Sequence, residues 1–177
     1  FCDMKEIHPD GREVLVRASK PYANSHVQGK YIAGMFAIEK KCFDEVGGYD
    51  EQLRFGENTE LGIRLRMKNV GMGFVNGCHF HYHISEAGGG KNWRNKMESN
   101  LRIVDKHPDY FRQHPVTKKL FLQVAAVAAV KIGEYQTANR IFGQLRKEFP
   151  KDLKLRLQQL ASAHPWLAKW VWSSQKN

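Results

Sequence analysis

The first part of this chain includes segments with the hydrophobic periodicity of strands, whereas the last part is helical throughout, and this difference limits most strongly which folds the chain can adopt. In the first hundred residues apolar and polar side chains alternate with the period of a β-strand, mainly at Met4–Ile7, Arg12–Val16 and Gly73–Ile84. Beyond Pro115 the spacing of apolar residues is helical throughout. We therefore predict an α/β domain over residues 1–112, followed by a helical tail over residues 113–177.

Several short elements are predicted within the first domain. The turn formers His8-Pro9-Asp10-Gly11 predict a hairpin between the first two strands. The run Tyr31–Ile38 is apolar on both faces and predicts a buried strand, whereas Glu39–Glu45 predicts a short helix that two glycines end. A second helix is predicted over Thr59–Asn69, with Asn58 as its N-cap and a stop at the next glycine.

The tail is predicted to form four helices, separated by Gly133, Pro150 and Pro165. Its pattern resembles a tetratricopeptide-type repeat, but only one pair of helices is well formed, and such arrays need about three repeats to be stable alone. We therefore expect these helices to pack on the main domain.

The positive charge of the chain is concentrated in the tail. The net charge is +10, yet residues 1–100 carry 14 Lys and Arg against 13 Asp and Glu, whereas residues 101–177 carry 14 against 5. Trp166, Trp170 and Trp172 lie beside Lys169 and Lys176, a composition typical of an interfacial membrane anchor. The alternative is that these tryptophans pack on the catalytic domain. No nucleic-acid recognition motif is present, so nucleic acid is not a predicted partner.

The N-terminus and the cysteines bear on where the chain is expected to be found. The N-terminus has neither an initiator methionine nor the layout of a secretion signal, so we interpret the chain as a piece of a larger protein. Its three cysteines show no CxxC spacing, which predicts reduced thiols. No apolar run reaches 18 residues, so no membrane span is predicted. We predict a cytoplasmic protein, with peripheral membrane association as an open possibility.

One stretch carries most of the functional signal. From Ile32 to His83 the sequence is IAGMFAIEKKCFDEVGGYDEQLRFGENTELGIRLRMKNVGMGFVNGCHFHYH. Its small-residue run, basic pair, VGG-aromatic-DE turn, acidic helix start and histidine-terminated strand resemble, in order and spacing, the second half of family 2 inverting glycosyltransferases. The GEN variant and the C-x4-H ending also resemble the polypeptide N-acetylgalactosaminyltransferases. The resemblance covers about residues 1–110.

This resemblance implies a fold and a reaction. The fold would be the C-terminal, mixed-sheet half of the A-type nucleotide-diphospho-sugar transferase fold. The enzyme would be a hexosyl- or N-acetylhexosaminyl-transferase that moves a sugar from a nucleoside diphosphate sugar to a hydroxyl of a saccharide, lipid-linked or protein acceptor, with Mn or Mg as cofactor. The nucleotide-binding half would precede Phe1, so the isolated fragment is expected to be inactive.

Glu57 and Asn58 are the predicted catalytic residues. Sugar transfer needs a carboxylate beside the acceptor hydroxyl and a cation to neutralise the departing diphosphate. Glu57 precedes the predicted helix start, where the macrodipole favours an ionised carboxylate. The family places its general-base Asp at the position of Asn58, and an amide cannot accept a proton. Either Glu57 is the base of an inverting reaction, or the enzyme retains configuration. The alternative without catalysis makes Asn58 an N-cap and Glu57 a helix-dipole charge.

His83 matches the family's third metal ligand, and His81 is a second candidate on the same face of a regular strand, together with His79. Nitrogen and carboxylate ligands both suit manganese. The family's Asp-x-Asp or Asp-x-His motif is absent from the chain, so the first ligands are expected upstream. The alternative is that these histidines are hydrogen-bonded structural residues.

The remaining candidates would bind substrate. The glycine-rich segment Ser85–Trp93 corresponds to a lid in the related enzymes, from which Lys91 and Arg94 would reach diphosphate oxygens. The alternative is an exposed surface loop whose charges are solvated. Gly34 and Met35 begin the strand that in the family passes beneath the sugar, although simple core packing explains these two residues better.

Asp50 and Glu51 would face the acceptor, although a turn role explains Asp50 equally well. Two rival functions stay open for the whole chain: a non-catalytic helical-repeat adaptor, and a basic membrane-surface or nucleic-acid-binding module.

Overall fold

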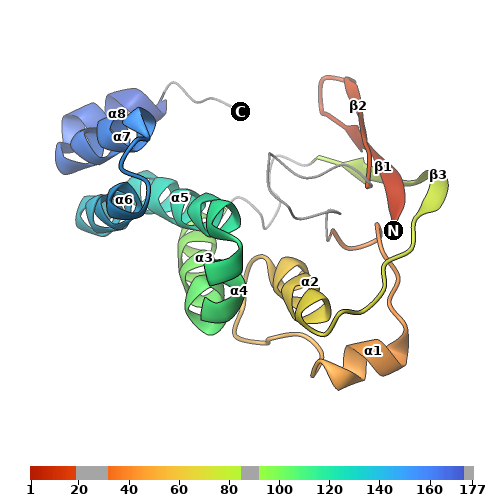
Figure 1. The fold of residues 1–177 in the computed structure, drawn as a ribbon. Helices are drawn as coiled ribbons and strands as arrows, with labels where there is room; N and C mark the ends of the chain where they lie inside the picture. The colour runs from red at the N-terminus through yellow and green to blue at the C-terminus, as the bar shows by residue number, and fades with distance from the viewer. Residues whose placement is uncertain (19–31, 85–91, 174–177) are drawn as a thin grey trace. The chain divides into compact units, whose positions relative to one another are not determined.

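The computed structural model describes residues 1–18, 32–84 and 92–173 of the chain. The chain forms two compact units, Phe1–Lys91 and Asn92–Asn177. The first, called here the sheet unit, combines three strands with two helices, and the second, the helical unit, contains helices only in its described part (Figure 1). The protein is therefore a mixed α/β protein. The division between the two units falls between Lys91 and Asn92, whereas the domain boundary predicted from the sequence is at residue 112.

The sheet unit is built on a small mixed sheet. Strands β1 (Cys2–Ile7) and β2 (Glu13–Val16) pair antiparallel, and β3 (Val75–His83) pairs parallel with β1, so β1 is the central strand (Figure 1). The predicted hairpin is confirmed. Its turn is closed by a 2.9 Å hydrogen bond from the backbone N–H of His8 to the carbonyl of Arg12.

Strand β3 pairs irregularly at its start and regularly at its end. Cys2 lies opposite Val75, whereas Asp3 already lies opposite Cys78, so β3 contains extra residues. From the pair of Met4 and Phe80 the register is regular to its end. The predicted alternation along β3 is therefore confirmed only in its second half.

The predicted buried strand at Tyr31–Ile38 is wrong over its described residues, 32–38. These residues form a turn in which the N–H of Met35 donates to the carbonyl of Ile32 at 3.0 Å. Gly34 has φ +92°, and the ring of Phe80 lies only 2.4 Å from where a Cβ atom on Gly34 would be. The backbone therefore bends around this ring, and the apolar residues fill a small core instead of pairing in the sheet. That core consists of Met4, Ala18 and Met35, with Phe1, Val16, Ile32 and Phe80 packed against it.

Two helices follow. Helix α1 (Lys40–Glu45) is confirmed as predicted and is followed by Gly47 and Gly48, both at positive φ. Helix α2 (Glu57–Met67) begins two residues earlier than predicted. Its N-cap is Gly56, at φ +73°, so the prediction of Asn58 as N-cap is wrong. The helix ends before Asn69, which has φ +55° and stops the helix without the downstream glycine.

The helical unit is a chain of packed helices. They are α3 (Trp93–Lys106), α4 (Pro108–Gln113), α5 (Pro115–Lys131), α6 (Tyr135–Glu148), α7 (Leu153–Ala163) and α8 (Pro165–Ser173). Helix α5 packs against α3 and α6, while α7 packs against α6 and α8. The four predicted tail helices are confirmed within a few residues. Helix α4 was not predicted; its first residue, Pro108, follows the end of α3, and a proline is tolerated at the first position of a helix.

Alanine and aromatic side chains fill the centre of the helical unit. Ala125, Ala129 and Ala138 are fully buried, as are Phe142 and Leu145. The small side chains of α5 let the neighbouring helices approach closely.

The described tryptophans of α8 have different surroundings. Trp172 is buried and stacks on Phe142, with ring centroids 6.0 Å apart, whereas Trp166 is 70% exposed. Packing rather than membrane anchoring therefore accounts for Trp172, while the side chain of Trp170 lies outside the description. Among the helices that the structure describes, none is both long and apolar enough to cross a bilayer.

Candidate functional site

Two motif segments of the sheet unit meet through side-chain hydrogen bonds. The hydroxyl of Tyr49, from VGGYDE, donates to Oδ1 of Asn58 at 2.9 Å. The amide Nδ2 of Asn58 then donates to Oε1 of Glu57, also at 2.9 Å. Tyr49 is itself packed edge-on against Phe43, with ring centroids 5.3 Å apart. The result is a hydrogen-bonded series, Tyr49 to Asn58 to Glu57, which we call the Glu57 site.

A buried ion pair holds the two segments of the Glu57 site together. Glu60 is fully buried, and Nε and Nη2 of Arg64 donate to its carboxylate at 2.7 to 3.0 Å. The same guanidinium also donates to the carbonyls of Val46 and Gly48, in the turn that leads to Tyr49. Arg64 therefore fixes the turn against α2. The motif comparison missed this residue, although the spacing of Glu60 and Arg64 is that of a helical i,i+4 ion pair.

The chemistry available at the Glu57 site is that of a carboxylate with one oxygen held. Glu57 is half-buried in the first turn of α2, where a negative charge is favoured. Its Oε1 accepts the bond from Asn58, and no other hydrogen bond or ion pair reaches Glu57 within the described ranges. The second carboxylate oxygen can therefore accept a proton from a bound hydroxyl.

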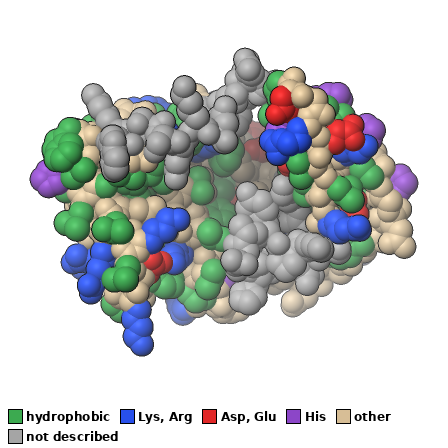
Figure 2. Space-filling model, turned by 90° about the horizontal axis from the view of Figure 1, so that it is seen from above, with side chains coloured by type: hydrophobic (Ala, Val, Ile, Leu, Met, Phe, Trp, Pro, Cys, Tyr) green, Lys and Arg blue, Asp and Glu red, His purple; other side chains and the backbone are tan. Residues whose placement is uncertain are grey.

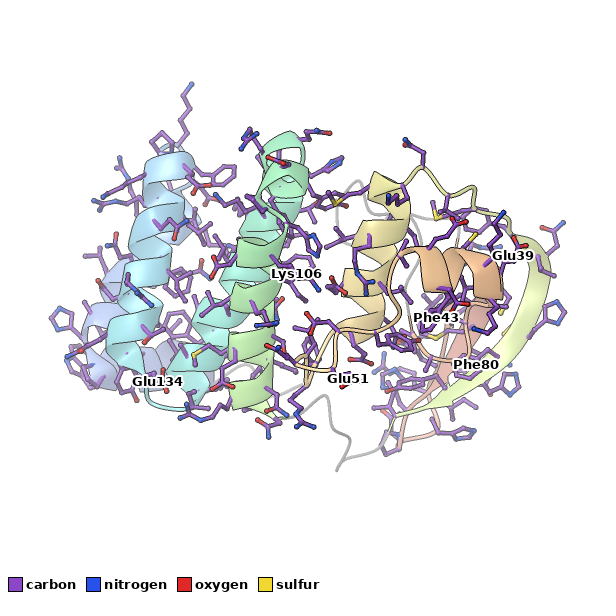
Figure 3. All side chains as sticks on the ribbon, turned by 90° about the horizontal axis from the view of Figure 1, so that it is seen from below. Glu39, Phe43, Glu51, Phe80, Lys106 and Glu134 are labelled. Atoms are coloured by element: carbon purple, nitrogen blue, oxygen red, sulfur yellow. The ribbon has the colours of Figure 1, made fainter. Side chains whose placement is uncertain are left out.

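Asp50 and Glu51 lie in the loop before α2 and differ in role. Oδ1 of Asp50 accepts from the backbone N–H of Gln52, and its carbonyl accepts from that of Leu53, both at 3.0 Å. These bonds define an Asx-type turn, so the turn role predicted for Asp50 is present. Glu51 is exposed on this loop (Figure 3).

The two candidate metal ligands lie at the end of β3. His81 lies opposite Lys5 in the register and His83 opposite Ile7, so the two imidazoles share one face of the sheet, and both residues are exposed. His79 does not belong to this regular part: its Nε2 lies 2.9 Å from the carbonyl of Asn76, and its ring covers Gly77. The predicted row of three histidines is therefore wrong, because the irregular pairing ends just before Phe80.

An ion pair shares the exposed sheet face with these histidines. Nζ of Lys5 lies 2.9 Å from Oε2 of Glu13. The hydrogen bond and the charge of Lys5 lower the pKa of the Glu13 carboxyl, and His81 contributes a smaller lowering. Over residues 1–18, 32–84 and 92–173, no group of three or more His, Cys, Asp or Glu side chains is arranged to hold a metal ion. His81 and His83 can therefore supply only part of a ligand set.

The predicted site residues do not all come together. Neither Glu57 nor Asn58 forms a hydrogen bond or ion pair with His81 or His83 in the part of the chain that the structure describes.

Three of the predicted substrate-binding residues have other surroundings. Gly34 is covered by Phe80, and Met35 is buried in the sheet-unit core. Arg94 belongs to the helical unit and pairs with Glu134 at 2.9 Å. Glu134 lies at the turn between α5 and α6 (Figure 3). Lys91 lies outside the described residues.

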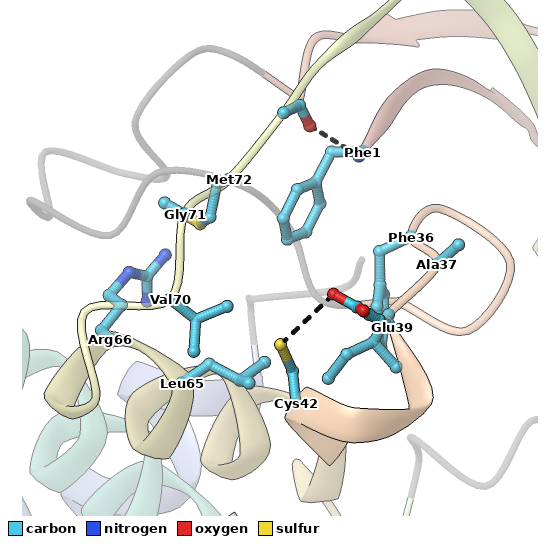
Figure 4. Close-up of a pocket in the computed structure, with 12 residues that line it drawn as sticks. Phe1, Phe36, Ala37, Glu39, Cys42, Leu65, Arg66, Val70, Gly71 and Met72 are labelled. Carbon is cyan, nitrogen blue, oxygen red and sulfur yellow. Dashed lines mark hydrogen bonds between the residues drawn. The ribbon is translucent and has the colours of Figure 1, made fainter. Parts of the chain in front are cut away.

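A cavity of about 270 Å³ lies elsewhere in the sheet unit, between α1, the end of α2 and the segment before β3 (Figure 4). Its polar groups include Cys42, whose Sγ lies 3.9 Å from Oε2 of Glu39. None of the predicted site residues lines this cavity, whose walls are Phe1, Phe36–Glu39, Cys42, Leu65, Arg66 and Val70–Gly73.

Comparison with known proteins adds no relative to this description. The chain matches no family model, no curated protein and no solved structure.

Proposed function

We propose that this chain forms the acceptor side of an A-type glycosyltransferase, which transfers a sugar from a nucleoside diphosphate sugar to an acceptor hydroxyl with the aid of Mn or Mg. The observation that carries the proposal is the Glu57 site. It joins VGGYDE and GEN, two of the segments that carry the family resemblance, through the bonds of Tyr49, Asn58 and Glu57. The geometry thus supports Glu57, the carboxylate one residue before the family's base position, as the base of this chain.

In this proposal Glu57 is the base. Its open carboxylate oxygen takes the proton of the acceptor hydroxyl while the acceptor oxygen forms a bond to the anomeric carbon. The bond from that carbon to the diphosphate breaks, and the diphosphate leaves with the electron pair. Attack opposite to the leaving group inverts the configuration.

Asn58 acts in this scheme through Glu57. An Asp at its position would put a second carboxylate beside the base, and like charges that close raise the pKa of one of the pair. The amide instead donates a hydrogen bond to Glu57 and accepts one from Tyr49, so it positions the base without competing for the proton.

The cation would neutralise the departing diphosphate. His83, with His81 beside it on the same face, is the proposed contribution of this chain to its ligands. Imidazole nitrogen and carboxylate oxygen both suit manganese, and both imidazoles are open to solvent.

Release of nucleoside diphosphate from a panel of nucleotide sugars by the intact protein, with and without manganese, tests the proposal. Glu57→Gln should lower turnover by about 10²- to 10⁴-fold, because a positioned base contributes that much. Glu45→Gln is the matched control: among the described residues, this exposed side chain on α1 forms only a 4.0 Å ion pair, with Lys41. Failure to turn over any nucleotide sugar, or equal turnover by wild type and Glu57→Gln, would reject the proposal.

A double variant identifies the position of the base. If Glu57 takes the proton, Glu57→Gln combined with Asn58→Asp stays as inactive as Glu57→Gln alone. If the family's base position is the functional one, the new carboxylate at position 58 restores turnover. The anomeric configuration of the product, read by NMR, separates the inverting from the retaining reaction.

A non-catalytic adaptor is the second candidate function. It is favoured by the packing of the helical unit, in which α6 contacts its chain neighbours α5 and α7, as helices of a repeat array do. Unchanged activity of the intact protein after Glu57→Gln would favour this candidate over the enzyme.

A further inference from the structure

Helix α7 exposes apolar side chains on the side away from its core. Leu153, Leu157 and Leu160 are 68%, 68% and 61% exposed, whereas Leu155 is fully buried. At 100° per residue, the three exposed leucines fall within an arc of about 60°, and Leu155 points the opposite way. These three residues, which we call the leucine strip, form a continuous apolar row and not scattered surface residues.

Positive side chains flank the leucine strip on both sides. On the helical wheel Lys154 lies on one side of the strip and Arg156 on the other, and Lys151 precedes the helix; all three are exposed. Within the described residues none of these three forms an ion pair.

The nearby carboxylates already have partners. Asp152 accepts from Lys119 and from the backbone N–H of Leu155, and Glu148 pairs with Lys118 at 2.8 Å. Helix α7 itself contains no Asp or Glu. The positive charge beside the strip is therefore not compensated locally. Figure 2 shows hydrophobic side chains beside Lys and Arg side chains on the surface of the helical unit.

We infer that helix α7 docks the protein on the surface of an anionic lipid bilayer. The leucine strip enters the boundary between headgroups and acyl chains, and Lys154 and Arg156 on its two sides contact lipid phosphates. An apolar row between two positive rows is the arrangement of a helix that lies in a membrane interface. This inference does not rest on the proposed sugar transfer.

Other occupants fit the surface less well. A second copy that paired strip to strip around a two-fold axis would bring the positive rows of both copies together, which like charges oppose. Lys154 and Arg156 would bind the phosphates of a nucleic acid, but three exposed leucines offer no aromatic surface on which bases stack. An anionic bilayer takes up both the apolar and the charged part of this face.

Co-sedimentation of the full chain with vesicles tests the inference. Vesicles of phosphatidylcholine alone are compared with vesicles that also contain phosphatidylglycerol. The wild type should bind only the anionic vesicles, and Leu153→Gln/Leu157→Gln/Leu160→Gln should abolish binding. Lys154→Gln/Arg156→Gln should weaken binding by about 25-fold, because each basic residue near an anionic surface contributes about fivefold.

The matched control is Leu15→Gln. Leu15 is 50% exposed on β2 of the sheet unit, so its replacement removes one exposed leucine elsewhere and should leave binding unchanged. Tryptophan fluorescence in urea verifies that each variant of α7 is folded, because all four tryptophans belong to the helical unit.

Three outcomes would overturn the inference. They are equal sedimentation with neutral and anionic vesicles, binding by the folded triple variant as strong as that of the wild type, or loss of binding in Leu15→Gln. A strip-dependent dimer in sedimentation equilibrium, or binding to nucleic acid but not to anionic vesicles, would assign the face to those occupants instead.

Discussion

Replacing Arg64 by methionine should lower the stability of the sheet unit strongly and leave that of the helical unit unchanged. Glu60 is fully buried, and Arg64 is its ion-pair partner. Removing one partner of a buried pair costs about 3–5 kcal/mol, and Arg64→Met takes away the guanidinium that donates to both oxygens of a carboxylate held out of water. The same change releases the carbonyls of Val46 and Gly48. The loss is a large part of the 5–15 kcal/mol that ordinarily holds a domain folded.

The position of the tryptophans makes this prediction measurable. The sheet unit contains no tryptophan, so fluorescence during urea unfolding follows only the helical unit. Hydrogen exchange of the amides in α2, residues 57–67, follows the sheet unit. Arg64→Met should raise the exchange rates in α2 strongly and leave the fluorescence transition unchanged.

An exposed pair with the same spacing supplies the control. Lys40 and Asp44 on α1 also form an i,i+4 pair, but their side chains are 85% and 55% exposed. Lys40→Met should cost only about 0–1 kcal/mol, as exposed ion pairs do. If Arg64→Met costs no more than this control, the reasoning that assigns Arg64 to the fixing of the turn is refuted. Replacing Glu60 and Arg64 together by methionine should cost less than Arg64→Met alone, because the buried carboxylate is then removed together with its guanidinium partner.

Three further predictions follow from packing and charge. The hydrogen bond from Lys119 lowers the pKa of Asp152, so the stability that this carboxylate contributes is present above the unfolded pKa of 3.8 and is lost as the pH falls through the lower folded pKa. Asp152→Asn should therefore lower the stability of the helical unit by about 1 kcal/mol at pH 7. Urea unfolding followed by fluorescence at a series of pH values should show this difference vanish in acid. Gly34→Ala should destabilise the sheet unit by about 1–3 kcal/mol, because the residue has φ +92° and the Phe80 ring occupies the place of the new methyl group. Hydrogen exchange of the amides in β1 should become faster, and unchanged exchange would mean that the ring moves aside. Leu145→Ala, at a fully buried position of α6, should lower the free energy of unfolding of the helical unit by about 2–5 kcal/mol, which fluorescence would show as a transition at lower urea concentration. A loss below about 1 kcal/mol would contradict the packing described for the helical unit.

Local signals were enough to predict most of the secondary structure. The hairpin follows from Pro9-Asp10-Gly11 between two alternating segments, and the helices of the tail follow from their periodicity and from the breaks at Gly133 and Pro150. These features depend on residues close in sequence, which propensity rules describe.

The errors have non-local causes. The apolar run 32–38 satisfies the pattern of a buried strand, but whether it extends or turns depends on the ring of Phe80, which arrives from a distant part of the chain. The histidine row in β3 required regular pairing, and the irregularity appears only where β3 meets β1. Alternation within one segment cannot reveal either contact.

The sequence was enough to predict the candidate catalytic residues, but not the residues that hold them in place. Glu57 and Asn58 are adjacent in the sequence, and the motif order identifies them. Tyr49 and Arg64 become part of the site only through folding, since one bonds to Asn58 and the other holds the turn from which Tyr49 projects. Sequence patterns name the side chains that do chemistry more easily than those that position them.

The parallel pairing of β1 with β3 also affects the order of folding. Ile7 lies opposite His83, so the central strand waits for a partner that follows almost the whole sheet unit along the chain. The helical unit, whose helices pack mostly against close neighbours in sequence, carries no such entropic delay. On a chain that emerges N-terminus first, β1 is made well before β3 and should therefore be among the last strands to acquire its final partner, and until then the edge of β1 is open to wrong ones.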